Sequence, residues 1–271
     1  EVARAARRNG GRVLVNVGRI VEPDPAAAFL PARSVDAVVY HPDTEQTGGV
    51  FHRDPWKILT TAGDEPIAKG LARLRFINRI APVVRRRSES DAVLLRLAAA
   101  VLTAVSAEGA VVSIGTGLPE EIPAVIFEEG RLQRFRFLVE TGVVGGLPAS
   151  GLYFGAALRP KEIIPSAQLF KRCGERLEGT CLGALEIDRH GNVNVSRRGP
   201  ALRDYVGPGG FIDFATHART IVFVSSWMRG GEIALDDNGL RIVRHGLPKL
   251  VDRVEEITFD APAARRRGQR V

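Results

Sequence analysis

Short apolar runs bounded by glycine, proline and charged residues are the most regular feature of the chain. Runs rich in valine and isoleucine have the length and composition of buried β-strands, and they occupy residues 12–21, 35–40, 110–114, 136–139 and 220–225. Residues 88–106 instead repeat leucine, valine and alanine at helical spacing, and Ser88 or Ser90 can serve as the N-cap. Residues 1–8 and 120–128 also predict helices. This alternation is typical of an α/β fold with a largely parallel sheet.

Turn-forming residues mark further elements in the second half of the chain. Residues 184–187 and 193–196 flank an Asp-Arg-His-Gly turn, which predicts a hairpin. A second hairpin is predicted around the Asp-Asp-Asn-Gly turn within residues 233–243, and residues 254–259 predict the last strand. Residues 167–182 are polar and follow neither period, so we predict no element there.

The order of these elements suggests a division into three segments. Residues 1–45 start with the end of a helix, and we expect them to be the tail of an upstream α/β domain. Residues 46–85 combine a glycine-rich loop with mixed helical spacing, and we expect a linker with connecting helices. Residues 86–271 then form the main domain.

Composition places the chain among ordinary globular proteins. It has 271 residues, 45% of them hydrophobic and 25% charged, which is enough to bury a substantial core. No apolar run approaches the roughly 20 residues of a membrane-spanning helix, and no signal peptide opens the chain, so we expect a cytoplasmic protein without a membrane partner. Its two cysteines, Cys173 and Cys181, are too few for a disulfide framework, and no Cys/His cluster has metal spacing.

Net charge adds little to this picture. The 38 basic and 31 acidic residues leave a formal charge of +7, spread along the chain except for the runs Arg85 to Arg87 and Arg265 to Arg267. We interpret both runs as solvated surface, and we expect no nucleic-acid partner.

The stretch from Phe135 to Gly151, FRFLVETGVVGGLPASG, carries the main candidate for chemistry. Glu140 follows the apolar run directly and is itself followed by several glycines and a proline, so the backbone can approach a ligand closely. Two interpretations stay open at this point. Glu140 either caps a neighbouring helix or is a carboxylate nucleophile at the mouth of the sheet.

A second glycine turn joins the strand at residues 110–114 to the helix that Glu120 and Glu121 begin. Its residues Gly115 and Gly117 leave backbone amides pointing out of the turn, which is a general arrangement for binding an anion. Many α/β proteins share this arrangement, so by itself it indicates only a ligand-binding α/β domain.

Five motifs in a fixed order resemble the second, glutamate-bearing half of the family I CoA-transferases, in particular the single-chain branch that includes propionate and acetate CoA-transferases. They are SIGTGLP (113–119), VETGVVGG (139–146), GNVNVS (191–196), GPGGF (207–211) and VEEITF (254–259). The resemblance implies a three-layer α/β domain with a mostly parallel sheet, of the NagB/RpiA-like kind. It also makes residues 1–45 the tail of an upstream CoA-transferase-like domain.

The resemblance implies a role for each motif. Glu140 is the nucleophile, and the amides of Gly209 and Gly210 stabilise the oxyanion. The implied CoA-binding residues are Gly207, Phe211, Gly115, Gly117, Gly145 and Gly146. CoA passes from an acyl-CoA to a carboxylate acceptor through an acyl-glutamyl anhydride and a glutamyl-CoA thioester. CoA is thus a substrate, and the resemblance implies neither a tightly bound cofactor nor a metal.

The resemblance also implies a partner and leaves alternatives open. The active site lies between two α/β halves, so we expect the other half in the same gene product or as a separate subunit, in a homo-oligomer. Relatives usually have Pro and Ile where this chain has Val143 and Val144, which is a mild change. The cations among residues 171–176 indicate either a dicarboxylate acceptor or a solvated surface. A CoA-thioester hydrolase and a non-catalytic ligand-binding domain are the alternative functions, and an intact Glu140 with GPGGF argues against the second.

Overall fold

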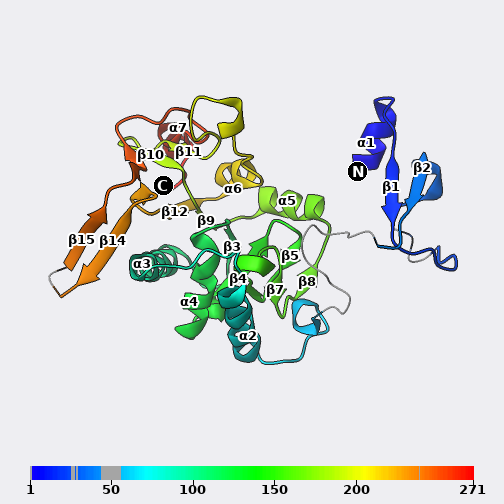
Figure 1. Ribbon diagram of the computed structural model, residues 1–271, viewed down its shortest axis with the longest axis horizontal. Coiled ribbons are helices and arrows are strands. Elements are labelled where there is room, and N and C mark those ends of the chain that lie inside the picture. Colours follow the sequence, from blue (N-terminus) through cyan, green and yellow to red (C-terminus); the bar gives the residue numbers. More distant parts are fainter. Residues whose placement is uncertain (1, 26–27, 29, 44–55, 238) are drawn as a thin grey trace. The chain divides into compact units, whose positions relative to one another are not determined.

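The computed structural model describes residues 2–25, 28, 30–43, 56–237 and 239–271 (Figure 1). The chain divides into two compact units, Glu1–Pro55 and Trp56–Val271. The division lies inside the segment 46–85 predicted as linker and connecting helices, and most of the predicted loop before Trp56 lies outside the described residues. The assignment of residues 1–45 to an upstream domain stays a prediction.

Unit 1 is a small parallel α/β element. Helix α1 (Val2–Arg8) precedes strand β1 (Leu14–Val17), which pairs in parallel with β2 (Ala37–Tyr40), and a 3-10 turn occupies Ala32–Ser34. Asp36 joins these parts, because its carboxylate accepts the Val13 amide at 2.8 Å and pairs with Arg12 and Arg7. The Val13 hydrogen bond and the two arginines lower the pKa of Asp36. The predicted helix and both predicted strands of this region are confirmed.

Unit 2 is built on a mixed sheet with the strand order β12-β9-β3-β4-β5-β8 (Figure 1). Its parallel strands are β3 (Ala110–Ile114), β4 (Phe135–Val139), β9 (Gly179–Leu182) and β12 (Thr220–Phe223). Strands β5 (Val143–Val144) and β8 (Glu162–Ile163) continue it in antiparallel register. Buried Ser113 and Thr180 share a 2.7 Å hydrogen bond between β3 and β9, so neither hydroxyl is left unpaired. The predicted, largely parallel α/β sheet is confirmed.

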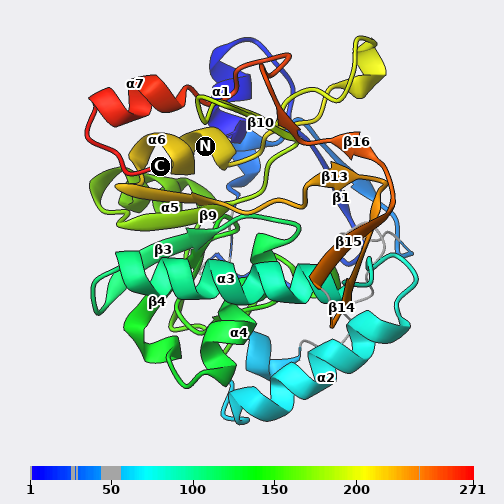
Figure 2. The same ribbon diagram turned by 90° about the vertical axis from the view of Figure 1, so that its left-hand side faces the viewer.

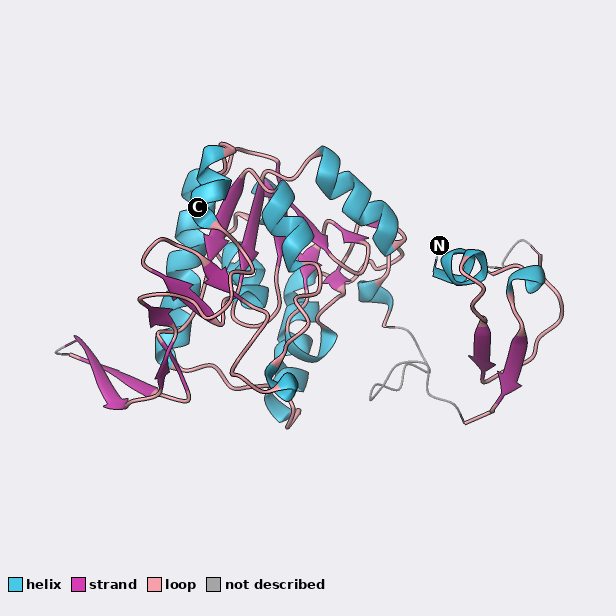
Figure 3. Ribbon diagram, turned by 90° about the horizontal axis from the view of Figure 1, so that it is seen from above, coloured by secondary structure: helices cyan, strands magenta, loops and turns pink. Residues whose placement is uncertain are grey.

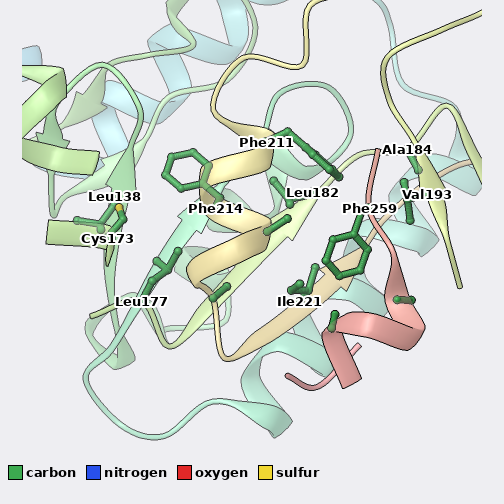
Figure 4. Close-up of a cluster of buried hydrophobic side chains, with 14 of the residues drawn as sticks. Leu138, Cys173, Leu177, Leu182, Ala184, Val193, Phe211, Phe214, Ile221 and Phe259 are labelled. Carbon is green, nitrogen blue, oxygen red and sulfur yellow. The ribbon is translucent and has the colours of Figure 1, made fainter. Parts of the chain in front are cut away.

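Helices cover both faces of this sheet (Figure 2). One face carries α3 (Glu89–Val105) and α4 (Ile122–Glu128), whose core includes Leu102, Ile126 and Phe137. The other carries α5 (Ser166–Glu175), α6 (Phe211–His217) and α7 (Ala261–Arg266), whose core includes Leu169, Phe214 and Ile221 (Figure 4). Parallel strands are buried on both faces, which is why their sequences read as continuous apolar runs. The three-layer prediction is confirmed.

Smaller elements surround this sandwich. Helix α2 (Ile67–Ile80) packs through Leu71 and Leu74 near the pair β6 (Leu147–Pro148) and β7 (Ala157–Leu158). The predicted hairpin around residue 238 is present as β14 (Glu232–Asp236) and β15 (Gly239–Arg244), which extend beyond the sandwich (Figure 3). Further 3-10 turns occupy Lys57–Leu59, Pro119–Glu121, Leu132–Arg134, Gly151–Tyr153 and Leu202–Asp204.

A small sheet at the carboxyl side of β9 contains a second predicted hairpin and one wrong prediction. Strands β10 (Glu186–Asp188) and β11 (Val193–Asn194) form the hairpin, and β10 also pairs with β17 (Leu250–Val251). Nearby, β13 (Met228–Arg229) pairs with β16 (Leu247–Pro248). The strand predicted at residues 254–259 is wrong. The segment lies beside β11, and because its backbone hydrogen bonds to that strand all involve Val193, it forms only an isolated bridge from Phe259 to Val193.

The structure distinguishes between the two N-caps proposed for α3. Ser88 accepts the Asp91 amide at 3.1 Å and the Asp91 carboxylate accepts the Ser88 amide at 3.0 Å, forming a capping box, whereas Ser90 reaches the Ser88 hydroxyl. We therefore predict that Ser88→Ala lowers the free energy of unfolding by about 1 kcal/mol. Ser90→Ala is the matched control and should cost clearly less. Urea denaturation of both variants measures the difference, and equal losses would contradict the assigned cap.

Candidate active site

Glu140 directly follows β4, at the edge of the sheet where the parallel strands end. Its side chain is half-buried, and its backbone carbonyl accepts the Ser166 hydroxyl, from the first residue of α5, at 2.8 Å. The next residue, Thr141, donates its hydroxyl to the Gly155 carbonyl. The backbone on both sides of the carboxylate is therefore held by neighbouring segments.

The carboxylate of Glu140 meets the glycine loop that precedes α6. The amide of Gly210 donates to Glu140 Oε2 at 3.2 Å, although the two residues are 70 positions apart. A Cβ on Gly209 would lie 3.7 Å from the same oxygen. The structure thus brings together the predicted nucleophile and the predicted oxyanion loop.

Gly210 has no room for a side chain. A Cβ there would lie 2.9 Å from Glu140 Oε2 and 2.9 Å from Cζ of Phe170, closer than such atoms approach in proteins. Phe170 belongs to α5 and stacks on Phe214 of α6, with ring centroids 5.3 Å apart. Glycine at this position therefore lets a backbone amide reach the carboxylate between two packed helices.

Sequence reasoning missed Phe170 because it predicted no element over residues 167–182, and it therefore also missed Ser166, which begins the helix directly before that range. The signal was present, since Leu169 and Cys173 are four residues apart, as on one face of a helix, and both are buried. The many charged residues of the segment hid this spacing. They lie on the outer side of α5.

The remaining loop residues differ in exposure. Phe211 is buried in the core, with its ring 6.2 Å from that of Phe223, so its side chain anchors the loop to the sheet (Figure 4). Gly207 is exposed, and no atom lies within 4 Å of a Cβ built there. CoA binding by these two residues stays a prediction.

The turn after β3 is occupied by a carboxylate of the chain itself. Glu120 accepts the amides of Gly117 at 3.2 Å and Gly151 at 3.1 Å, and its burial raises its pKa. Arg87 pairs with Glu120 at 3.3 Å and with Glu121, and it donates to the Gly117 carbonyl. Because the Gly115 amide donates to the Cys181 carbonyl, neither glycine amide is free for a ligand in this arrangement. A CoA contact there stays a prediction.

Comparison with known proteins places this geometry in a family. No protein-family model matches the chain. Caffeate CoA-transferase from Acetobacterium woodii is 30% identical over 280 residues, covering 100% of this chain and 50% of that enzyme. Acetate CoA-transferase YdiF from Escherichia coli O157:H7 is 30% identical over 275 residues, covering 98% of this chain and 47% of that enzyme. The crystal structure of the YdiF apoenzyme matches with a TM-score of 0.72 and 26% identity, over 99% of this chain and 47% of that one.

The chain belongs to the family I CoA-transferases. It spans about half the length of the curated relatives it matches. The sequence resemblance is confirmed at the level of the family and of the fold.

In this CoA-transferase chain, Gly145 and Gly146 connect β5 to β6. The Gly145 amide donates to the Phe137 carbonyl at 2.8 Å. A Cβ on Gly146 would lie 2.5 Å from the Leu158 carbonyl oxygen, so the turn needs glycine there for close packing of β6 and β7. Both glycines shape the backbone that follows Glu140, and their predicted contact with CoA stays a prediction.

Two arginines, one in α5 and one directly after it, are paired with carboxylates. Arg172 pairs with Glu162 at 2.8 Å and Arg176 with Glu178 at 2.5 Å. Arg172 is the main reason why the pKa of Glu162 is lowered. Lys171 is exposed. The pairing supports the interpretation of this segment as solvated surface and not as a pocket for a dicarboxylate.

Other reactive groups lie outside the site. Burial raises the pKa of Cys173 to about 11 and that of Cys181 to about 12, so both thiols are poor nucleophiles near neutral pH. Within residues 2–25, 28, 30–43, 56–237 and 239–271, no group of three or more His, Cys, Asp or Glu side chains is arranged to hold a metal ion. No helix in that part of the chain is long and apolar enough to cross a membrane.

Proposed function

We propose that this chain carries the nucleophile of an enzyme that transfers CoA from an acyl-CoA to a carboxylate acceptor. The observation that carries the proposal is the 3.2 Å hydrogen bond from the Gly210 amide to Glu140 Oε2. A half-buried carboxylate that accepts a backbone amide at a sheet edge is suited to attack an activated carbonyl. The same amide is in place for the negative charge that develops later.

The chemistry proceeds through two covalent forms of Glu140. Its carboxylate attacks the thioester carbonyl, expels CoA thiolate and forms an acyl-glutamyl anhydride. The thiolate then attacks the glutamyl carbonyl of the anhydride, which releases the first carboxylate and leaves a glutamyl-CoA thioester. An acceptor carboxylate attacks that thioester, and the same steps in reverse give the new acyl-CoA and free Glu140.

The position of Gly210 supports a role for its amide in one of these steps. Oε2 belongs to the glutamyl carboxyl group, so the amide faces the oxygen that becomes negatively charged when CoA attacks the glutamyl carbon. A donor aligned before reaction lowers the barrier without reorganisation, and removing such a donor typically costs about 3 kcal/mol. Gly209 lies near the same oxygen and provides a second candidate amide.

The names of the relatives support CoA as the common substrate. They are a caffeate and an acetate CoA-transferase, and YdiF has also been solved as a thioester complex with CoA. The two names specify different acids. We therefore propose a CoA-transferase without assigning its acyl group or its acceptor, with CoA as substrate and no tightly bound cofactor.

We propose further that a second α/β half completes the active site, in the same gene product or as a separate subunit, within a homo-oligomer. The chain matches about half of each relative, which supports this arrangement. Helix α3 also exposes an apolar stripe at i, i+4 spacing, formed by Val93, Leu97, Val101 and Val105. A stripe of this kind is typical of a surface that packs against another one.

The first functional prediction concerns covalent loading of Glu140. When the protein that contains this chain and its second half is incubated with acetyl-CoA, mass spectrometry should find CoA attached to the peptide carrying Glu140. Glu140→Ala should abolish the adduct and lower kcat by roughly 10⁴-fold or more. Glu175→Ala, an exposed glutamate at the end of α5, is the control and should retain both.

Several outcomes would contradict this assignment. An adduct on another residue, or full activity in Glu140→Ala, would exclude Glu140 as the nucleophile. Release of free acid without dependence on a carboxylate acceptor would show a thioester hydrolase. Absence of any reaction across a panel of acyl-CoA donors would indicate a non-catalytic ligand-binding domain.

The second prediction tests the Gly210 amide. Gly210→Ala places a methyl group against both Glu140 and Phe170, so the amide must move away from Oε2. We expect kcat and kcat/KM to fall together by roughly 10². Gly174→Ala on α5 is the matched control, because its Cβ would make only ordinary contact with His217, at 3.6 Å. A change in Gly210→Ala confined to KM for the acyl-CoA would support binding in place of transition-state stabilisation.

The third prediction concerns the second half. The 271-residue chain expressed alone should be poorly soluble or inactive, because its apolar stripe on α3 is exposed and its active site lacks the second half. Co-expression with the second half should restore acyl exchange. Size-exclusion chromatography and an exchange assay on both preparations test this. A stable isolated monomer with full transferase activity would refute it.

A further inference from the structure

A group of basic side chains without carboxylate partners lies at the same edge of the sheet as Glu140. At its centre is Lys249, between β16 and β17, which is half-buried and donates from Nζ to the Ala184 carbonyl at 2.8 Å and to Ser225 Oγ at 2.9 Å. Ala184 follows β9 and Ser225 follows β12. Since β9 and β12 are parallel to β3 and β4, these contacts place Lys249 at the carboxyl edge of the sheet.

Arginines from three other segments act on the same ammonium group. Arg229 lies on β13, whose partner strand β16 ends directly before Lys249. Arg85 comes from the connection between α2 and α3, and Arg198 from the segment after β11. Burial and the charges of these arginines lower the pKa of Lys249, and Asp91, which caps α3, opposes them. Cations that converge in this way destabilise one another unless an anion binds among them.

Ion pairing within the chain does not relieve this repulsion. Considering only the residues that the structure describes, Lys249, Arg85, Arg198 and Arg229 form no ion pair. Arginines with an evident structural role are paired, as Arg87 is with Glu120 and Glu121. Unlike Arg87, these four cations are therefore not neutralised by a carboxylate among the described residues.

The distance along the sheet edge indicates which anion fits. The strand order β12-β9-β3-β4 separates the end of β4 from those of β9 and β12 by two and three strand spacings, or roughly 10 and 14 Å. The pantetheine arm of CoA has about a dozen bonds between its sulfur and its pyrophosphate, comparable to four extended residues or roughly 14 Å. A thiol placed at Glu140 would therefore put the phosphates of CoA near Lys249.

We propose that Lys249, Arg85, Arg198 and Arg229 form the binding site for the phosphates of CoA. This assignment rests on the proposed function, because it uses Glu140 as the position of the thiol. The half-buried Lys249 is held in place by Ala184 and Ser225, and the arginines supply further positive charge around it. The arginines of the run Arg85 to Arg87 then have different roles. Arg87 stabilises the fold through its ion pairs, and Arg85 binds the ligand.

Calorimetry on the protein with its second half tests the assignment, using CoA and pantetheine as probes. Lys249→Met and Arg85→Met should each weaken CoA binding by about tenfold or more, the loss expected for one charge-assisted contact, and should leave pantetheine binding unchanged. Arg86→Met is the matched control, because Arg86 is an exposed arginine next to Arg85 that the proposed site does not include, and this variant should bind CoA as the parent does. Added salt should weaken CoA binding more in the parent than in the variants.

The outcomes separate this assignment from the proposed function. Acyl exchange in the parent, with CoA binding unaltered in both variants, would overturn the assignment alone. CoA binding with the expected losses but without acyl exchange would support the assignment and count against the proposed function. A parent that binds no CoA would overturn both. If Lys249→Met does not fold, Arg85→Met on the surface decides.

Discussion

Parallel pairing of β4, β3, β9 and β12 is the constraint on which the rest of the molecule's chemistry depends. It brings the carboxyl ends of these strands to one edge, so that Glu140, the turn at Gly115, Ala184 and Ser225 lie along one line although they are far apart in the sequence. A parallel sheet must be covered on both faces, and the helix layers with their separate apolar cores provide this cover. Hydrophobic burial between the sheet and its helices therefore fixes the positions of the polar groups along this edge.

Close packing at one end of this edge determines the geometry of the candidate nucleophile. Helices α5 and α6 meet through the stacked rings of Phe170 and Phe214, and the backbone of Gly210 passes between Phe170 and the Glu140 carboxylate. The hydrogen bond from the amide is thus set by the packing of two helices and not by a flexible side chain. Such a donor is already oriented when charge develops, which is the condition for strong electrostatic stabilisation.

Some charged groups along the edge are balanced by opposite charges of the chain, and others are not. The buried Glu120 is neutralised within the chain, by Arg87 and by the amides of Gly117 and Gly151, so that it fastens the turn after β3 to a neighbouring loop. Around Lys249 the positive charges are held together by the fold without a carboxylate to balance them. The ion pairs of Glu120 stabilise the fold, whereas the unbalanced positive charges around Lys249 attract an anion. Both arrangements depend on which segments the sheet brings to its carboxyl edge.

Local pattern in the sequence was sufficient wherever an element depends on its own neighbours. The helix predicted at residues 88–106 is present as Glu89–Val105, and the run before Glu140 is a buried strand. Prediction failed at residues 254–259, whose backbone reaches only Val193 of β11 and so makes a bridge in place of a strand. It also failed at α5, whose apolar spacing is concealed by surface charges. By itself the sequence determined the α/β class, the strand that ends at Glu140 and the order of the motifs that resemble the family. Only the tertiary structure decided that Gly210 donates to Glu140 across 70 residues, that Phe170 packs against Gly210, and that Lys249 reaches Ala184 and Ser225, because these contacts depend on how the sheet and its helices pack.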